Sequence, residues 1–141
     1  MFKKPASRVV AAVSAAAALS VLAFSGTAQA RVGAPYIGYG QTNNPNGVWC
    51  VQHQLNFLFA NNWNWRPGVT PHRQISEDSK FGPETDEAIR FFQKAYFPWQ
   101  VDGIVGPESG YALLWDGDPV YGYDEKVTKA GYCNTYIPSI V

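Results

Sequence analysis

The sequence predicts an all-α fold, in which a compact three-helix domain lies between an irregular N-terminal arm and a C-terminal tail. Two segments, 48–58 and 85–95, carry apolar residues at spacings of three and four, the period of an amphipathic helix. Two Gly-Pro-Glu triplets, at 82–84 and 106–108, are typical helix starts, because proline at the first helical position loses no hydrogen bond.

The first 30 residues have the layout of a secretory signal peptide. Three basic residues precede an apolar run over 9–24, and Ala28 and Ala30 are the small residues that a signal peptidase requires. The run is shorter than the ~20 residues that cross a bilayer. We therefore expect cleavage after Ala30, a secreted, extracellular mature chain, and no membrane contact after cleavage.

The charge of the mature chain argues against a nucleic-acid partner. Residues 31–141 contain eight basic and eleven acidic residues, a net charge of about −3, whereas nucleic-acid affinity depends on clustered Lys and Arg.

A metalloenzyme would use three protein ligands at recognisable spacing, and His53 and His72 stand in no such motif. We expect no enzymatic activity, no metal and no cofactor.

Cys50 and Cys133 are the two cysteines, and both remain after signal cleavage. In an exported protein two thiols predict one disulfide, here closing a loop of about 83 residues with a stabilisation of about 4–5 kcal/mol. The alternative is a nucleophilic Cys50 beside His53. It is disfavoured because a thiol outside the cell with a second cysteine available oxidises.

Composition and periodicity divide the chain into a signal peptide, an arm, a helical domain and a tail. These segments are 1–30, 31–46, 47–115 and 116–141. The predicted helices run from Asn46-Gly47 to Asn61-Asn62, from Pro83 to a stop at Pro98, and from Pro107 to about Trp115. Residues 61–79 predict a long loop, and loops of this length are often functional.

An internal repeat relates the second and third helices. Residues 78–85 and 102–109 match after a shift of 24 residues, and each copy is an acidic turn, an apolar residue and a helix start. In each copy we expect the aspartate to accept backbone N–H bonds, the glycine before proline to permit the sharp helix entry, and the apolar residue to fill the core. These pairs are Asp78 and Asp102, Gly82 and Gly106, and Phe81 and Val105. A calcium loop is disfavoured because neither copy offers six oxygen ligands.

Three motifs resemble the peptidoglycan-binding-like domain family, a three-helix module. They are Val51-Gln52-His53-Gln54-Leu55, then Phe81-Gly82-Pro83-Glu84-Thr85 with Phe92-Gln93, and Asp102-Gly103-Ile104-Val105-Gly106-Pro107. The resemblance covers about Val48 to Trp115. The chain departs from the family at Val51, where leucine is usual, at Ser79, where glycine is usual, and at Ser109-Gly110, where Thr-Trp is usual, and its first loop is longer.

The resemblance implies adhesion to peptidoglycan and therefore association with the bacterial cell wall. Such modules usually accompany cell-wall hydrolases. The mature segment is too short to be expected to hold a catalytic domain as well, so we expect this chain to act alone or to recruit a separately encoded hydrolase. A secreted protein-interaction module, an inhibitor or a partner of an exported protein, is the alternative, because the arm and the tail are rich in tyrosine.

The first loop holds the residues predicted to bind the ligand. Trp63 and Trp65 are expected to stack on sugar rings, with Asn64 beside them, while Arg66 meets a carboxylate and Arg73 lies further along the loop. The structural alternative, which the small size of the domain favours, is that both tryptophans fold back to cover the core.

Overall fold

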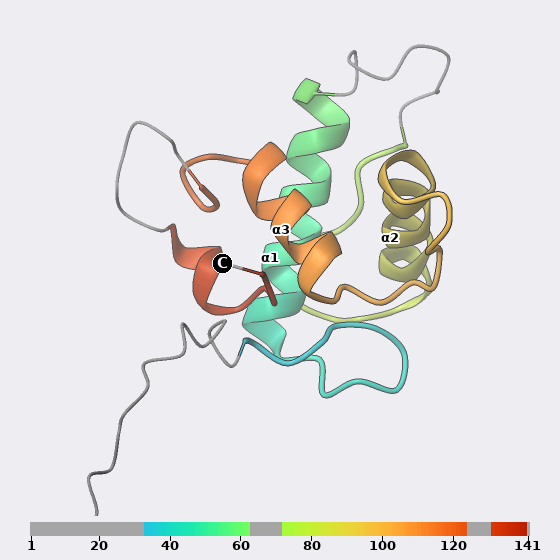
Figure 1. Ribbon diagram of the computed structural model, residues 1–141, viewed down its shortest axis with the longest axis horizontal. Helices are drawn as coiled ribbons and strands as arrows, with labels where there is room; N and C mark the ends of the chain where they lie inside the picture. The colour runs from blue at the N-terminus through green and yellow to red at the C-terminus, as the bar shows by residue number, and fades with distance from the viewer. Residues whose placement is uncertain (1–32, 63–71, 124–130, 141) are drawn as a thin grey trace, which may run out of the picture.

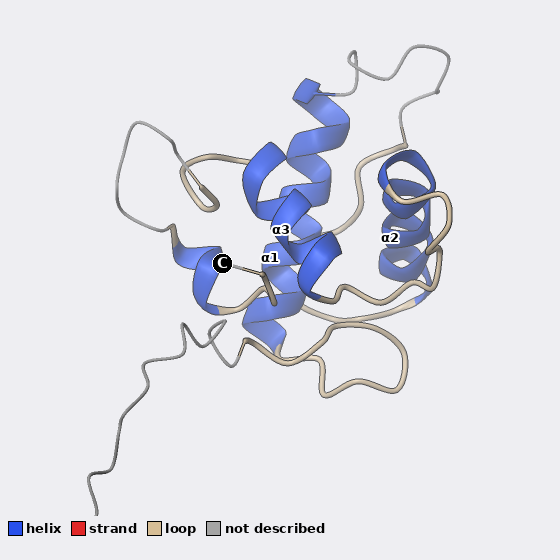
Figure 2. Ribbon diagram, viewed as in Figure 1, coloured by secondary structure: helices blue, strands red, loops and turns tan. Residues whose placement is uncertain are grey.

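Three α-helices pack around one core in the structure, a computed structural model that describes residues 33–62, 72–123 and 131–140. They are α1 (Pro45–Phe57), α2 (Pro83–Tyr96) and α3 (Pro107–Asp116), joined by a π-helical turn, η1 (Leu58–Asn62), and a 3-10 turn, η3 (Tyr132–Thr135). The described ranges contain no strand (Figure 2), so the predicted all-α class is confirmed. Nor does any helix in them have the length and apolarity to span a membrane.

Helix α1 is the central element of the fold. It contacts both α2 and α3; in Figure 1, α3 crosses in front of α1 and α2 lies to its right. Its buried positions include Val48, Val51 and Leu55, which meet Ile89 and Phe92 of α2 and Leu113 of α3 in one core. Since all these side chains are fully buried, the helices form one unit.

Helix α1 begins earlier than the sequence predicts. Asn44 is its N-cap, and the Asn44 side chain accepts hydrogen bonds from the backbone N–H groups of Asn46 (2.9 Å) and Gly47 (3.4 Å). Pro45 takes the first helical position, which suits proline. The expected start at Asn46-Gly47 is therefore wrong, because the capping asparagine lies before the proline. The helical run ends at Asn62 as expected.

Helices α2 and α3 begin at Pro83 and Pro107, as predicted. The expected role of the preceding glycines is wrong, because Gly82 (φ −147°) and Gly106 (φ −100°) have φ values open to any residue. Positive φ occurs instead at Ser79 (64°) and Gly103 (73°), which are equivalent positions of the repeat.

The apolar residues of the two turns differ in how deeply they are buried. Val105 is fully buried, as predicted. Phe81 is only partly buried and contacts Tyr39 edge-to-face, with ring centroids 5.1 Å apart. The prediction that Phe81 fills the core is therefore wrong, because its ring packs under the arm at the margin of the core.

A buried glutamine fixes the second turn of the repeat. The Gln93 amide nitrogen donates to the Asp102 carboxylate (2.8 Å) and the Ile104 carbonyl (3.0 Å). Its oxygen accepts from the backbone N–H groups of Asp102 (3.1 Å) and Gly103 (2.8 Å). Asp102 also accepts from the Ile104 N–H (2.9 Å), which confirms its predicted role in the turn.

Gln52 fixes the first turn in the same way. Its amide nitrogen donates to the Asp78 carboxylate, the Lys80 carbonyl and the Thr85 hydroxyl, at 3.0–3.1 Å. Its oxygen accepts from the Ser79 N–H at 3.0 Å. Asp78 accepts from the Lys80 N–H (3.0 Å), as predicted. The two turns therefore have the same kind of support, because each is hydrogen-bonded to the side-chain amide of a buried glutamine.

The arm and the tail are tied to the helices. Ile37 is fully buried and forms an antiparallel bridge with Val105, with N–O distances of 3.2 and 2.8 Å. Cys50 of α1 and Cys133 of η3 form the predicted disulfide, with Cα atoms 5.5 Å apart. These links hold both ends of the domain against the helical core.

The tail occupies the position where the family usually has a tryptophan. A Cβ atom on Gly110 would lie 1.7 Å from the Pro138 carbonyl oxygen and 2.8 Å from the Ile137 side chain. No side chain fits there while the tail is in place. The departure at Ser109-Gly110 therefore has a packing reason, because the tail covers this face of α3.

Candidate functional site

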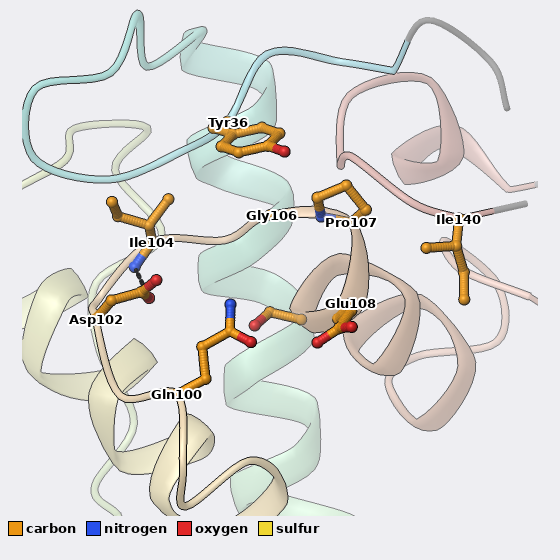
Figure 3. A pocket seen from close by; sticks show the side chains of 9 residues that line it. Tyr36, Gln100, Asp102, Ile104, Gly106, Pro107, Glu108 and Ile140 are labelled. Carbon is orange, nitrogen blue, oxygen red and sulfur yellow. Dashed lines mark hydrogen bonds between the residues drawn. The ribbon is translucent and has the colours of Figure 1, made fainter.

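An open pocket lies at the second turn of the repeat and the first turn of α3. Its volume is about 360 Å³. Its walls come from the arm, the turn, helix α3 and the tail, and are formed by Tyr36, Gln100, Asp102, Ile104, Gly106, Pro107, Glu108, Ser109 and Ile140. In Figure 3, Tyr36 lies on one side and Gln100 on the other, with Asp102 and Glu108 flanking the space between them. We call this the turn pocket.

The fold places each wall of the turn pocket through a fixed contact. The Ile37–Val105 bridge positions Tyr36. The Tyr36 ring lies beside Gly106, 3.7 Å from the point that a Cβ atom at this position would occupy. Gln93 holds Asp102 through two of the bonds described above. Because Ile37, Val105 and Gln93 are fully buried, they fix these walls of the pocket in the absence of a ligand.

The polar groups of the turn pocket are mainly hydrogen-bond acceptors. Two carboxylates, Asp102 and Glu108, line it together with the Gln100 amide and the Ser109 hydroxyl, and no Lys or Arg does. Glu108 lies in the first turn of α3, where the helix dipole stabilises a carboxylate. The pocket is therefore suited to ligands that carry hydrogen-bond donors or positive charge.

An aromatic stripe runs from the turn pocket along the outer face of α3. Tyr111 and Trp115 lie three and seven residues after Glu108, so all three share one face of the helix. The Tyr111 and Trp115 rings are 5.8 Å apart at an interplanar angle of 21°. Tyr123 extends the stripe, with its ring 6.0 Å from that of Trp115. Trp115 is 45 % exposed, so its ring is open to a ligand.

His53 joins separate parts of the chain, and its side chain is only 21 % exposed. Its two ring nitrogens lie 3.1 Å from carboxylate oxygens of Glu77 and Asp118. Its ring stacks on that of Trp49, with centroids 4.9 Å apart. The two carboxylates contact opposite nitrogens of the imidazole and so hold the ring in place. The described part of the chain contains no group of three side chains placed to hold a metal ion.

His72 lines a second pocket, of about 330 Å³, against α2. Its ring packs between Phe59 and Phe91, with both centroid distances 5.0 Å. Arg90 and Lys94 in the wall of this pocket stand beside Asp86 and Glu87, so its charges are mixed.

The predicted ligand-binding residues lie apart from the turn pocket or outside the described residues. Trp63, Asn64, Trp65 and Arg66 are outside the described ranges. Arg73 does not line the turn pocket, and its guanidinium is 3.3 Å from the Glu84 carboxylate in an exposed ion pair. Sequence reasoning missed Gln100, Glu108 and Ile140 as site residues, and it assigned the tyrosines of the arm, which include Tyr36, to the alternative of a protein-interaction module. Of the missed residues only Glu108 carried a signal, since it follows the Gly-Pro helix start.

The comparisons with known proteins support the resemblance. The family model described as putative peptidoglycan binding domain matches residues 50–113. This match includes residues 50–57 of α1, all of α2, both turns of the repeat and most of α3. No curated protein and no solved structure matches the chain. The predicted resemblance to this family is confirmed over that segment.

Proposed function

We propose that this chain, whose residues 50–113 match the putative peptidoglycan binding domain family, is a secreted, non-catalytic peptidoglycan-binding protein. The family match is the observation that carries the proposal. The turn pocket and the aromatic stripe support it, because together they offer the two kinds of surface that peptidoglycan requires. Peptidoglycan consists of sugar rings with apolar faces and of peptides with amide, amine and carboxylate groups.

The aromatic stripe is the proposed contact for the glycan strand. Trp115 and Tyr111 present nearly parallel rings on the outer face of α3, and aromatic faces suit the apolar faces of sugars. Glu108 and Trp115 are separated by about 10 Å along the helix, from the 1.5 Å rise per residue. A peptide branch entering the turn pocket therefore leaves the attached strand beside the stripe.

Co-sedimentation with purified sacculi tests the proposal. The wild-type protein is expected to pellet with sacculi, and Trp115→Ala to bind about 5- to 10-fold more weakly, the loss of one aromatic contact of about 1–1.4 kcal/mol. Trp99→Ala is the matched control, because Trp99 is 78 % exposed and lies outside both the pocket and the stripe. A wild-type protein that stays in the supernatant refutes peptidoglycan binding.

Secretion and the absence of catalysis are separate parts of the proposal. The exported protein is expected to begin at Arg31, which N-terminal sequencing of culture medium measures. Incubation with sacculi is expected to release no soluble wall fragments, and released fragments would show a hydrolase. If the protein recruits a separately encoded wall hydrolase, that enzyme is expected to be enriched on sacculi only when this protein is bound.

A further inference from the structure

We propose that the turn pocket binds a free primary amine of the peptidoglycan stem peptide, so that the protein prefers wall material that is not cross-linked. This inference rests on the proposed function and adds the chemical group that the pocket recognises. Stem peptides contain a diamino acid whose side-chain amine is charged when free. The amine becomes a neutral amide when it is used in a cross-link.

The charge of the turn pocket favours an ammonium group. Its charged lining residues are Asp102 and Glu108. Arg90, a cation that contacts the turn, forms an ion pair with Asp86 at 2.9 Å and donates to the Asp102 backbone carbonyl at 2.9 Å. Because Arg90 is already paired, it does not neutralise the two carboxylates that face the pocket.

The two carboxylates differ in the number of hydrogen bonds that they form within the protein. Asp102 is bonded to the Gln93 amide and the Ile104 N–H through one oxygen. Glu108 is exposed on α3 and forms no ion pair or hydrogen bond within the described ranges. A charged amine gains more from a carboxylate than a neutral amide does, because charge-assisted hydrogen bonds are about twice as strong. We therefore expect Glu108 to distinguish the charged amine from the neutral amide.

The remaining walls suit the carbon chain that carries such an amine. Ile104, Pro107 and Ile140 provide apolar surface, and Tyr36 lies across the space from Gln100 in Figure 3. An aromatic ring within about 6 Å of an ammonium attracts it through its π-electrons. An alkyl chain ending in –NH3+ therefore meets apolar contacts along its length and negative charge at its end.

Two preparations of the same sacculi test this inference. One is untreated, and the other has its free amines acetylated, which removes the positive charge as a cross-link does. The wild-type protein is expected to bind acetylated sacculi about tenfold or more weakly, the effect of losing one charged hydrogen bond. Glu108→Gln is expected to bind both preparations with equal, reduced affinity, and circular dichroism checks that its helices are retained.

Glu87→Gln is the control for net charge. Glu87 is exposed on α2 and outside the turn pocket, so this variant has the same net charge as Glu108→Gln and is expected to keep the preference for untreated sacculi. Equal wild-type binding to both preparations overturns the amine inference and leaves peptidoglycan binding intact. So does loss of the preference in Glu87→Gln, because the effect would then come from overall charge. Binding to neither preparation overturns the proposed function itself.

Discussion

The amide of Gln93 is expected to contribute several kcal/mol to stability, and Gln93→Leu tests this. The substitution keeps a side chain of similar size in a position that is fully buried. It removes the donor for the Asp102 carboxylate and the Ile104 carbonyl, and the acceptor for two backbone N–H groups. The second turn of the repeat then loses the group that joins its two sides.

The magnitude follows from the burial of each bond. The Gly103 N–H bond is buried, and a buried donor without an acceptor costs about 1–3 kcal/mol. The other three short bonds are partly buried, and water replaces part of each, so they contribute about 0.5–1 kcal/mol each. We therefore expect Gln93→Leu to lower the free energy of unfolding by about 2.5–6 kcal/mol.

Urea denaturation followed by circular dichroism measures this change in the disulfide-bonded protein. Gln74→Leu is the matched control, because Gln74 is exposed and surface substitutions usually change stability by no more than about 0.5 kcal/mol. A loss of less than 1 kcal/mol in Gln93→Leu, with a normal circular dichroism spectrum, would refute the view that the buried amide holds the turn together.

Three further substitutions test the turns and the tail. Ser79→Gly is expected to raise the free energy of unfolding by about 0.5–1 kcal/mol, because Ser79 has φ 64° and only glycine adopts this region without strain; a lower urea midpoint would contradict this. The pKa of Asp78 is lowered by the Lys80 backbone N–H and then by the Gln52 amide, so its contribution is present above the ordinary pKa of 3.8 and is lost as the pH falls through the lower folded-state value. Asp78→Asn is therefore expected to reduce the stability difference between pH 5 and pH 2 measured by urea midpoints, and an unchanged difference would exclude Asp78. Gly110→Ala is expected to cost about 1–3 kcal/mol by overpacking against the tail, and unchanged thermal unfolding would show that the tail yields without cost.

The helices were predictable because their signals are local. Proline at the first position and apolar residues at helical spacing identified α2 and α3 to within about one residue. The start of α1 was missed because Asn44 acts through its side chain from outside the helix. The repeat correctly paired Asp78 with Asp102, since an aspartate that bonds the N–H two residues later acts within a single turn.

The buried amides and the turn pocket were not predictable from these local signals. Gln93 precedes Asp102 by nine residues and Gln52 precedes Asp78 by 26, so the two glutamines do not align when the repeat is shifted by 24. Both glutamines belong to the motifs of the family resemblance, but their partners emerge only from the packing. Tyr36 enters the pocket because Ile37 pairs with Val105, and no pattern in the arm indicates that pairing.

The tail links the family departure at Gly110 to the shape of the turn pocket. Pro138 lies against Gly110, and two residues later Ile140 forms part of the pocket wall. The same tail is fixed to α1 by the Cys50–Cys133 disulfide, which closes a loop long enough to contribute about 4–5 kcal/mol in the chain-entropy model. A tryptophan at position 110 would exclude the tail and with it this wall of the pocket. The small residue at 110 and the disulfide therefore act together, since one makes room for the tail and the other keeps it there.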